Sequence, residues 1–277
     1  MIDLHTHSTA SDGRRTPRDL VACAAAAGVT VLSVTDHDTI GGCDPAQAAC
    51  AEAGIEFVPG IEISAMRAER DVHVLGYFID VRAPALLTFL ADQRALRLAR
   101  VRQMIRRLGA CGITLDAVAI LQPALDDPEK AVGRPWIARA LVEHGHCATI
   151  GEAFDRWLSR GHPTYVPRLA APPDDVIARI HDAGGVASLA HPGLLGHDEW
   201  IPELCLAGLD ALEAYHTKHD AERTRHYVVL AERLGLAVSG GSDYHDDASH
   251  GAVMPGSVAL PREAYDRLAR LKRVARL

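Results

Sequence analysis

Residues 1–13 read MIDLHTHSTASDG, and a short apolar run, Ile2 to Leu4, leads directly into His5, Thr6 and His7. On a β-strand, side chains two residues apart lie on the same face, so both imidazoles point to one side. A strand can offer two nitrogen ligands to a metal ion in this way. A single HxH pair is weak evidence for a metal site. The interpretation therefore requires further ligands from other parts of the chain.

Alternating strand and helix signals extend outward from this first strand. Short β-like runs cover Val31 to Val34, Glu56 to Pro59 and Val72 to Tyr77, and alanine-rich helical stretches follow Pro17 and Pro45. Repeated β-α units place their strands parallel, so we expect a parallel sheet over the first 80 residues.

The same alternation returns near the end of the chain, in GGVASLAHP (184–192), LDALEAYH (209–216) and LGLAVSGGSD (234–243). Helical segments precede these runs, as in Pro173 to Ala183 and Ala221 to Leu234. With 277 residues, 48% of them hydrophobic, the chain can bury a large core. We therefore expect both ends of the chain to build one barrel-like α/β core.

Strand signals fade between residues 93 and 168, where amphipathic helices take over. In RALRLARVRQMIRRLG (94–109), one face carries Leu98, Val101, Ile105 and Leu108. We expect residues 1–92 and 169–277 to form the two parts of the barrel. Residues 93–168 would form a helical insertion that serves as a lid or substrate domain.

Polar and aromatic residues of this insertion each allow a functional and a structural interpretation. Its arginines could bind phosphate, but the polar face of a helix is usually solvated, and we expect that role for most of them. These arginines are Arg94, Arg97, Arg100, Arg102, Arg106 and Arg107. Trp136 and Trp157 could stack on a base, yet aromatic residues at helical spacing are more often core residues, as we expect here.

Composition and charge exclude several classes of protein. The net charge is -7 with acidic and basic residues mixed along the chain, so we expect no duplex nucleic acid as a partner. We find no P-loop, no G-x-G-x-x-G after a strand, and no CxxC pair among six cysteines. The sequence opens without a signal peptide or membrane-spanning run, so we expect a cytoplasmic protein with no membrane partner.

Residue types that bind metals recur at the expected strand ends. They are Asp36, His37 and Asp38 in TDHD, Glu62 in GIEIS, His73, His191 in AHP, and Asp243 and His245 in GGSDYH. Strand ends converge at one mouth of a β/α barrel, where buried histidines and carboxylates need metal ions to offset their desolvation. Asp36 or Asp38 could orient His37, but a turn role explains Asp38 equally well. We expect the histidines that lack this context to be ordinary core or surface residues. They are His144, His146, His162, His181, His197, His226 and His250.

The motifs DLHTHSTASDG, TDHD, GIEIS, HVLGYF, AHP and SGGSDYH together resemble those of the PHP (polymerase and histidinol phosphatase) superfamily, in its stand-alone phosphoesterase branch. RPWIARAL in the insertion and LDALEAYH resemble the members that include nucleoside 3',5'-bisphosphate phosphatases and 5'-3' exoribonucleases. The resemblance implies a distorted (β/α)7 barrel with a helical insertion domain.

The resemblance also implies three divalent ions. It assigns His5, His7, Glu62 and Asp243 to the first ion, Glu62, His73 and His191 to the second, and Asp12, His37 and His245 to the third. Asp12 stands where some PHP relatives have histidine. Six imidazoles and three carboxylates without a thiolate suit Mn²⁺, Zn²⁺ or Fe²⁺, and by analogy we expect Mn²⁺.

Water is the nucleophile that this site predicts. Two neighbouring ions can lower the pKa of a bridging water and hold the hydroxide in line with phosphorus, and no G-x-S-x-G elbow is present. Arg134, His216 and Lys218 are candidates for substrate binding, with Arg134 stabilising phosphoryl charge and His216 protonating the leaving oxygen. A surface ion pair explains Arg134 equally well, and a pure binding role explains His216.

We therefore expect a metal-dependent phosphoesterase that acts on a small nucleotide, converting nucleoside 3',5'-bisphosphate to nucleoside 5'-monophosphate and phosphate. The enzymatic alternatives are a histidinol-phosphate phosphatase and a 5'-3' exonuclease on short single-stranded RNA. A non-catalytic PHP metal-binding module is disfavoured because all nine expected ligands are present. C-N bond hydrolysis in an amidohydrolase-like barrel is disfavoured because no lysine lies near a strand end.

Overall fold

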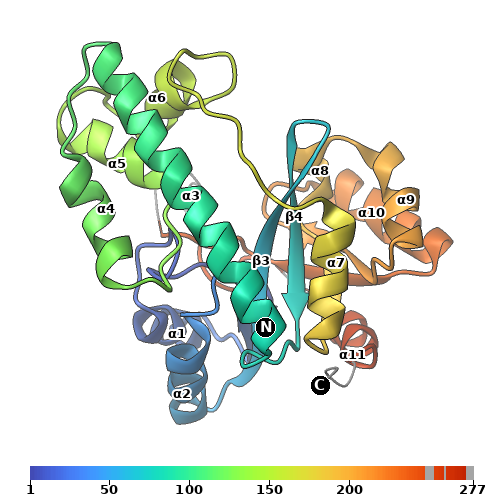
Figure 1. Cartoon of the computed structure of the whole chain (residues 1–277). Helices are drawn as coiled ribbons and strands as arrows, with labels where there is room; N and C mark the ends of the chain where they lie inside the picture. Colours follow the sequence, from blue (N-terminus) through green and yellow to red (C-terminus); the bar gives the residue numbers. More distant parts are fainter. Residues whose placement is uncertain (247–252, 259, 273–277) are drawn as a thin grey trace.

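The computed structural model describes residues 1–246, 253–258 and 260–272, and its centre is one sheet (Figure 1). Within these residues the sheet has seven strands, which lie side by side in chain order. The strands are β1 (Ile2–Asp3), β2 (Val31–Val34), β3 (Glu56–Arg67), β4 (Arg70–Tyr77), β5 (Val186–Leu189), β6 (Ala211–His216) and β7 (Ala237–Gly241). Each strand-like run in the sequence therefore forms a strand.

Backbone hydrogen bonds join the first strand to the last and nearly close the sheet into a barrel. The Leu4 amide donates to the Gly240 carbonyl (3.2 Å), and the Asp243 amide donates to the His5 carbonyl (2.8 Å). Gly241 permits this approach, because a Cβ there would lie 2.3 Å from the His5 nitrogen. The expected seven-stranded α/β barrel is confirmed.

The expectation of a parallel sheet over the first 80 residues is wrong at β4. This strand runs antiparallel to both β3 and β5, whereas the other neighbouring strands are parallel. Ala68 and Glu69 join β3 to β4 in a two-residue turn, and both have positive φ (46° and 60°), as tight hairpins require. Neither residue is a usual marker of such a turn, so the hairpin carried no signal in the sequence.

Helices cover the outside of the barrel. In the described residues they are α1 (Pro17–Ala26), α2 (Cys43–Ala53), α7 (Pro173–Asp182), α8 (Pro192–Leu195), α9 (Ile201–Leu206), α10 (Ala221–Leu234) and α11 (Arg262–Ala269). The Asp220 carboxylate caps α10 by accepting from the Arg223 amide (2.8 Å), and Gly235 ends it with φ 71°. No described helix combines the length and apolar character needed to cross a bilayer.

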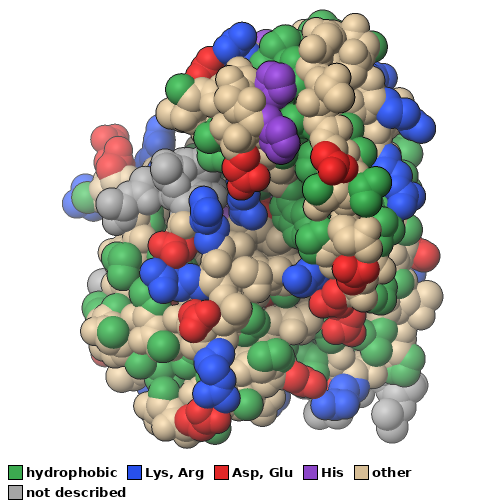
Figure 2. Space-filling view, turned by 90° about the vertical axis from the view of Figure 1, so that its left-hand side faces the viewer, with side chains coloured by type: hydrophobic (Ala, Val, Ile, Leu, Met, Phe, Trp, Pro, Cys, Tyr) green, Lys and Arg blue, Asp and Glu red, His purple; other side chains and the backbone are tan. Residues whose placement is uncertain are grey.

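A group of helices lies between β4 and β5. It comprises α3 (Pro84–Ala110), α4 (Ala117–Asp126), α5 (Arg134–Glu143) and α6 (Ile150–Ala153), followed by a π-helical turn (Phe154–Leu158). α3 connects two cores, because Leu90 packs in the barrel core and Val101 packs in a second core with residues of α4 and α5 (Figure 1). Trp136 and Trp157 pack against this second core, as expected. On the face that Figure 2 shows, acidic and basic side chains are interspersed.

The expected solvated face of α3 is wrong for Arg97 and Arg100, each of which is only 7% exposed. Arg97 pairs with Asp38 and donates to Ser64 Oγ (2.9 Å), both on the barrel. Arg100 donates from Nε to the Val166 carbonyl (2.8 Å). This part of α3 lies against the barrel mouth, and a helix pattern by itself does not tell which polar residues a neighbouring domain will cover.

Candidate metal centre and active site

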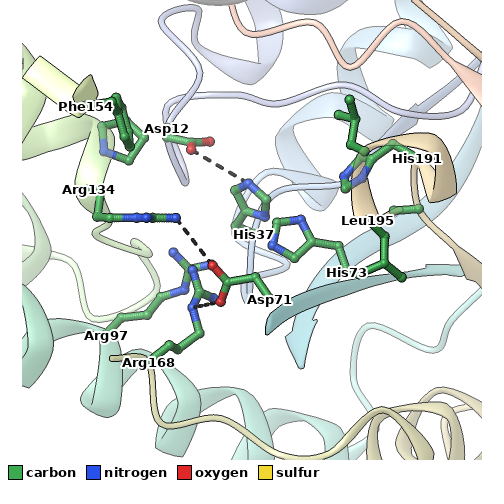
Figure 3. A pocket seen from close by; sticks show the side chains of 13 residues that line it. Asp12, His37, Asp71, His73, Arg97, Arg134, Phe154, Arg168, His191 and Leu195 are labelled. Carbon is green, nitrogen blue, oxygen red and sulfur yellow. Dashed lines mark hydrogen bonds and ion pairs between the residues drawn. The ribbon is translucent and has the colours of Figure 1, made fainter. Parts of the chain in front are cut away.

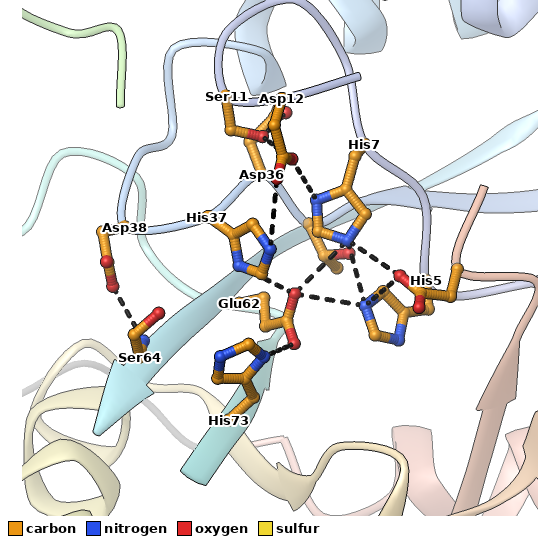
Figure 4. A network of polar contacts seen from close by, with 12 residues as sticks. His5, His7, Ser11, Asp12, Asp36, His37, Asp38, Glu62, Ser64 and His73 are labelled. Atoms are coloured by element: carbon orange, nitrogen blue, oxygen red, sulfur yellow. Dashed lines mark hydrogen bonds and ion pairs between the residues drawn. The ribbon is translucent and has the colours of Figure 1, made fainter. Parts of the chain in front are cut away.

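The metal-ligand residue types identified in the sequence gather at one mouth of the barrel (Figure 4). His5 and His7 follow β1, His37 follows β2, and Glu62 lies inside β3. His73 lies near the start of β4. Because β4 runs opposite to its neighbours, its beginning reaches the same mouth as the carboxyl ends of the parallel strands.

Glu62 lies at the centre of this cluster and is 1% exposed. Its two oxygens lie 2.7 to 3.3 Å from imidazole nitrogens of His5, His7, His37, His73 and His191. Oε1 faces His73 and His191, whereas Oε2 faces the other three rings. A carboxylate whose oxygens face two separate groups of imidazoles is placed to bridge two cations.

Two further carboxylates approach the cluster from different sides. Asp243 Oδ1 lies 3.4 Å from His5 Nε2 and 3.3 Å from His7 Nε2. Asp12 Oδ1 lies 3.3 Å from His245 Nε2 and 3.9 Å from the Nδ1 of His7. The three carboxylates and six imidazoles expected as ligands are therefore neighbours in space.

The geometry and chemistry of these residues fit divalent metal ions. Four groups have ligand atoms within 4.8 Å of one another: His7, Asp12, His37 and His245; His5, His216 and Asp243; His5, His7 and Glu62; and His37, Glu62 and His73. The buried Nδ1 atoms of His7 and His191 have no hydrogen-bond partner among the described residues. Buried imidazole nitrogens beside carboxylates are the donor set that such ions take.

Burial and neighbouring charge set the protonation of the cluster. Burial alone would raise the pKa of Glu62, yet the surrounding imidazoles hold it well below its usual value. Burial lowers the pKa of His37 to about 4, so its ring is neutral near pH 7. Burial also acts to lower the pKa of His7, but hydrogen bonds to Asp243 and Glu62 raise it to about 9. Because a histidine ligand must be neutral, a bound ion would displace the His7 proton.

Glu213 on β6 orients two of these histidines, a role that sequence analysis missed. Its side chain is fully buried, with Oε1 2.8 Å from His5 Nδ1 and Oε2 accepting from the His191 amide (2.7 Å). A signal was present, because Glu213 interrupts the apolar strand LDALEAYH and a carboxylate inside a strand of this kind needs a partner.

His219 holds the turn that follows His191, and sequence analysis assigned it no role. Its Nδ1 donates to the Ala214 carbonyl (2.9 Å), and its Nε2 accepts from the Gly193 amide (3.2 Å). His191 itself has φ 28°, which few residues other than glycine adopt. The turn is therefore held by hydrogen bonds on both sides of this strained residue.

Asp36 holds the loop that carries Asp12. It accepts hydrogen bonds from the Ser8 amide (2.7 Å), the Ser8 hydroxyl (2.6 Å) and the Ser11 hydroxyl (2.6 Å). From the sequence, we considered that Asp36 could orient His37. These hydrogen bonds instead hold the loop of residues 8–12.

The residues expected to contact substrate occupy different environments. His216 is buried, its Nε2 lies 3.4 Å from Asp243 Oδ2, and its Nδ1 accepts from the Lys218 amide (3.1 Å). With Nδ1 accepting, the proton of the neutral ring is on Nε2 and points to Asp243. The Lys218 side chain is exposed, whereas Arg134 is only partly exposed and pairs with Asp71 (3.3 Å). His250, which we expected to have no role in the site, lies outside the described residues.

A cavity of about 290 Å³ opens onto the cluster (Figure 3). Its lining includes His37, His73 and His191 on one side and Arg97, Arg134 and Arg168 on the other. Asp71 lies among the arginines, 3.2 Å from Arg168 Nε. Sequence analysis missed Asp71 and Arg168, although Asp71 precedes His73 by two residues on one strand and therefore shares its face.

A barrel mouth of imidazoles and carboxylates beside an arginine-lined cavity defines a metal-dependent hydrolase. The PHP domain family matches residues 3–114. A relative from Chromobacterium violaceum, named 3',5'-nucleoside bisphosphate phosphatase, is 36% identical over 265 residues, which cover 94% of this chain and 92% of the relative. A Haemophilus influenzae relative named 5'-3' exoribonuclease is 37% identical over 252 residues, covering 88% of this chain and 89% of its own.

A solved structure from Bifidobacterium adolescentis, described as a candidate metal-dependent phosphoesterase, superposes with a TM-score of 0.90 at 30% identity. The match covers 98% of this chain and 96% of the other. The chain belongs to the PHP family, as its motifs indicated. It is a metal-dependent phosphoesterase that uses divalent ions.

Proposed function

We propose that this protein hydrolyses a phosphate monoester of a small nucleotide, converting nucleoside 3',5'-bisphosphate to nucleoside 5'-monophosphate and phosphate. The observation that carries the proposal is the position of the Glu62 cluster at the floor of a cavity of about 290 Å³. A cavity of this size suits a small ligand. The name of the C. violaceum relative supports the choice of a bisphosphate.

Three divalent ions, preferably Mn²⁺, are part of the proposal. His5, His7, Glu62 and Asp243 would hold the first, Glu62, His73 and His191 the second, and Asp12, His37 and His245 the third. Bound ions would supply the activation of water and the charge that phosphoryl oxygens need. The contacts of Glu62 with two groups of imidazoles support its bridging position.

Arg134 and His216 complete the proposed machinery. Arg134 lines the cavity and would donate to phosphoryl oxygens with its planar guanidinium group. His216 would give a proton to the leaving oxygen, and its contact with Asp243 would also orient that carboxylate. Lys218 is proposed as a substrate contact at the exposed edge of the site.

We also propose that residues 93–168 act as a lid over the site. Arg97 of α3, Arg134 of α5 and Phe154 of the π-helical turn line the same cavity as the cluster histidines. A lid of this kind would admit mononucleotides and very short strands and exclude longer ones.

Release of phosphate or of mononucleotides from a panel of substrates tests this function. Protein loaded with Mn²⁺ is given adenosine 3',5'-bisphosphate, AMP, histidinol phosphate and a short RNA, with Asp243→Asn as the inactive control. Adenosine 5'-monophosphate and phosphate are the expected products. Preference for histidinol phosphate or RNA would favour those alternatives, and no release by metal-loaded protein would support the non-catalytic module.

A further inference from the structure

The loop that carries Asp12 is held by the helical insertion through its backbone carbonyls. Three successive carbonyls of the loop accept hydrogen bonds from residues of the insertion. The pairs are the Ala131 amide with the Ala10 carbonyl (2.9 Å), the Trp136 indole Nε1 with the Ser11 carbonyl (2.9 Å), and the Arg139 guanidinium with the Asp12 carbonyl. Residues 9–12 form a turn between β1 and α1, so contacts of this kind fix the path of the loop.

The barrel holds the same loop through Asp36, which accepts from the Ser8 and Ser11 hydroxyls (both 2.6 Å). The loop is thus fixed between the barrel and the insertion. Its Asp12 side chain is 7% exposed and points into the histidine cluster, with Oδ2 3.7 Å from His37 Nε2 (Figure 4). The position of this carboxylate therefore depends on both parts of the molecule.

The loop that carries His37, a second ligand proposed for the same ion, is also held by the insertion. Asp38 follows His37, and Arg94 of α3 donates to its carbonyl (3.2 Å) while Arg97 pairs with its carboxylate. Among the ligands proposed for the other two ions, two are held by Glu213 of the barrel itself. The insertion therefore contacts the loops of two of the three ligands proposed for the third ion.

We propose that Trp136 and Arg139 position Asp12 as a metal ligand, so that the helical insertion controls the affinity of the third ion site. The inference rests on the proposed function, which assigns Asp12 to this ion. A ligand atom must be held within about 0.5 Å of its productive position, and removal of an outer partner typically lowers metal affinity about 10- to 100-fold. Trp136 and Arg139 line a cavity of about 370 Å³ together with Ser11, which is distinct from the cavity that faces the histidines.

Metal binding by the whole chain tests the inference. Metal-free protein is dialysed against increasing concentrations of free Mn²⁺, and the bound metal is measured; wild type should bind three ions in resolvable steps. Trp136→Phe removes the indole donor but keeps an aromatic ring, and it should weaken one step about tenfold and leave the other two unchanged. Trp200→Phe is the control, because it makes the same change where the indole stacks on His197 (4.1 Å between ring centroids), and it should leave all three steps at their wild-type values.

Combined substitutions show whether the effect passes through Asp12. Asp12→Asn should weaken the same binding step, and Trp136→Phe added to it should cause less than about a twofold further change, because residues that act through one contact are not additive. Arg139→Met should weaken this step as Trp136→Phe does. Arg139→Lys keeps a donor for the Asp12 carbonyl and should recover part of the affinity.

The binding steps also separate this inference from the proposed function. Equal weakening of all three steps would indicate a general loss of structure, and unchanged affinities would show that the Asp12 loop keeps its position without the insertion; either result overturns the inference. Wild-type protein that binds only two ions would overturn it as well. Protein that binds three ions with the expected dependence on Trp136, but hydrolyses no substrate, would overturn the proposed function and retain the inference.

Discussion

At the scale of single residues, buried side chains that hold the proposed ligands matter as much as the ligands. Glu213 contacts His5 through one oxygen and the His191 amide through the other, and these histidines serve different ions in our proposal. One carboxylate thus positions parts of two ion sites. Partners of this kind typically change metal affinity about 10- to 100-fold when replaced.

Glu213→Gln tests this positioning role. An amide has one acceptor oxygen, so either His5 Nδ1 or the His191 amide would face an NH₂ group, and we expect divalent-ion affinity to fall about 10-fold or more. The affinity is measured as the metal content of the protein after equilibration at a series of free Mn²⁺ concentrations. Glu232→Gln on the exposed side of α10 is the control. Wild-type affinity in a folded Glu213→Gln protein would contradict the role.

At the scale of elements, α3 is attached to the barrel by a buried ion pair. Arg97 pairs with Asp38, which also accepts from the Ser64 amide (2.8 Å). Asp38 immediately follows His37 and has φ 52°. The pair therefore connects the helix that begins the insertion to the loop that carries a proposed ligand.

Arg97→Met should destabilise the protein by about 3–5 kcal/mol, because it leaves Asp38 buried without its main partner. Urea unfolding at pH 7 measures the loss. Arg18→Met is the control, since Arg18 and Glu52 form an exposed pair (63% and 61%), and its cost should stay below about 1 kcal/mol.

The same pair should depend on pH with a defined sign. Burial alone would raise the pKa of Asp38, but Arg97 and Arg168 hold it below its usual value. Stability from the pair is therefore present above the unfolded pKa of about 4 and lost as pH falls through the folded value. The difference in the free energy of unfolding between wild type and Arg97→Met should become smaller as the pH falls from 7 to 3. A constant difference would show that lost packing, and not charge, causes the effect.

At the scale of the whole molecule, the barrel closes around charged groups that would repel or be poorly solvated without cations. Removal of divalent ions should therefore lower the melting temperature. An ion present at about 100 times its Kd stabilises by about 2.7 kcal/mol, which for a chain of this size corresponds to at least about 5 °C. Thermal melts with chelator and with added Mn²⁺ measure the change, and an unchanged melting temperature would argue against ions bound in the folded state.

Much of the architecture followed from the sequence because its signals are local. The runs that became β2 and α10 were predicted at their observed bounds, since apolar patterns and caps depend on neighbouring residues. His5, His7, Glu62 and Asp243 could be named as candidate ligands because their residue types recur within motifs that resemble one family.

Tertiary structure decided the features that depend on residues far apart in the chain. The antiparallel direction of β4 followed from a turn without the usual marker residues. Arg97 is buried because α3 packs on the barrel mouth, whereas a helix pattern alone places this residue in solvent. Glu213 acquired its role from His5, 208 positions away. Local sequence patterns indicate which secondary structure a segment favours. The burial and the partners of its side chains depend on which distant segment packs against it.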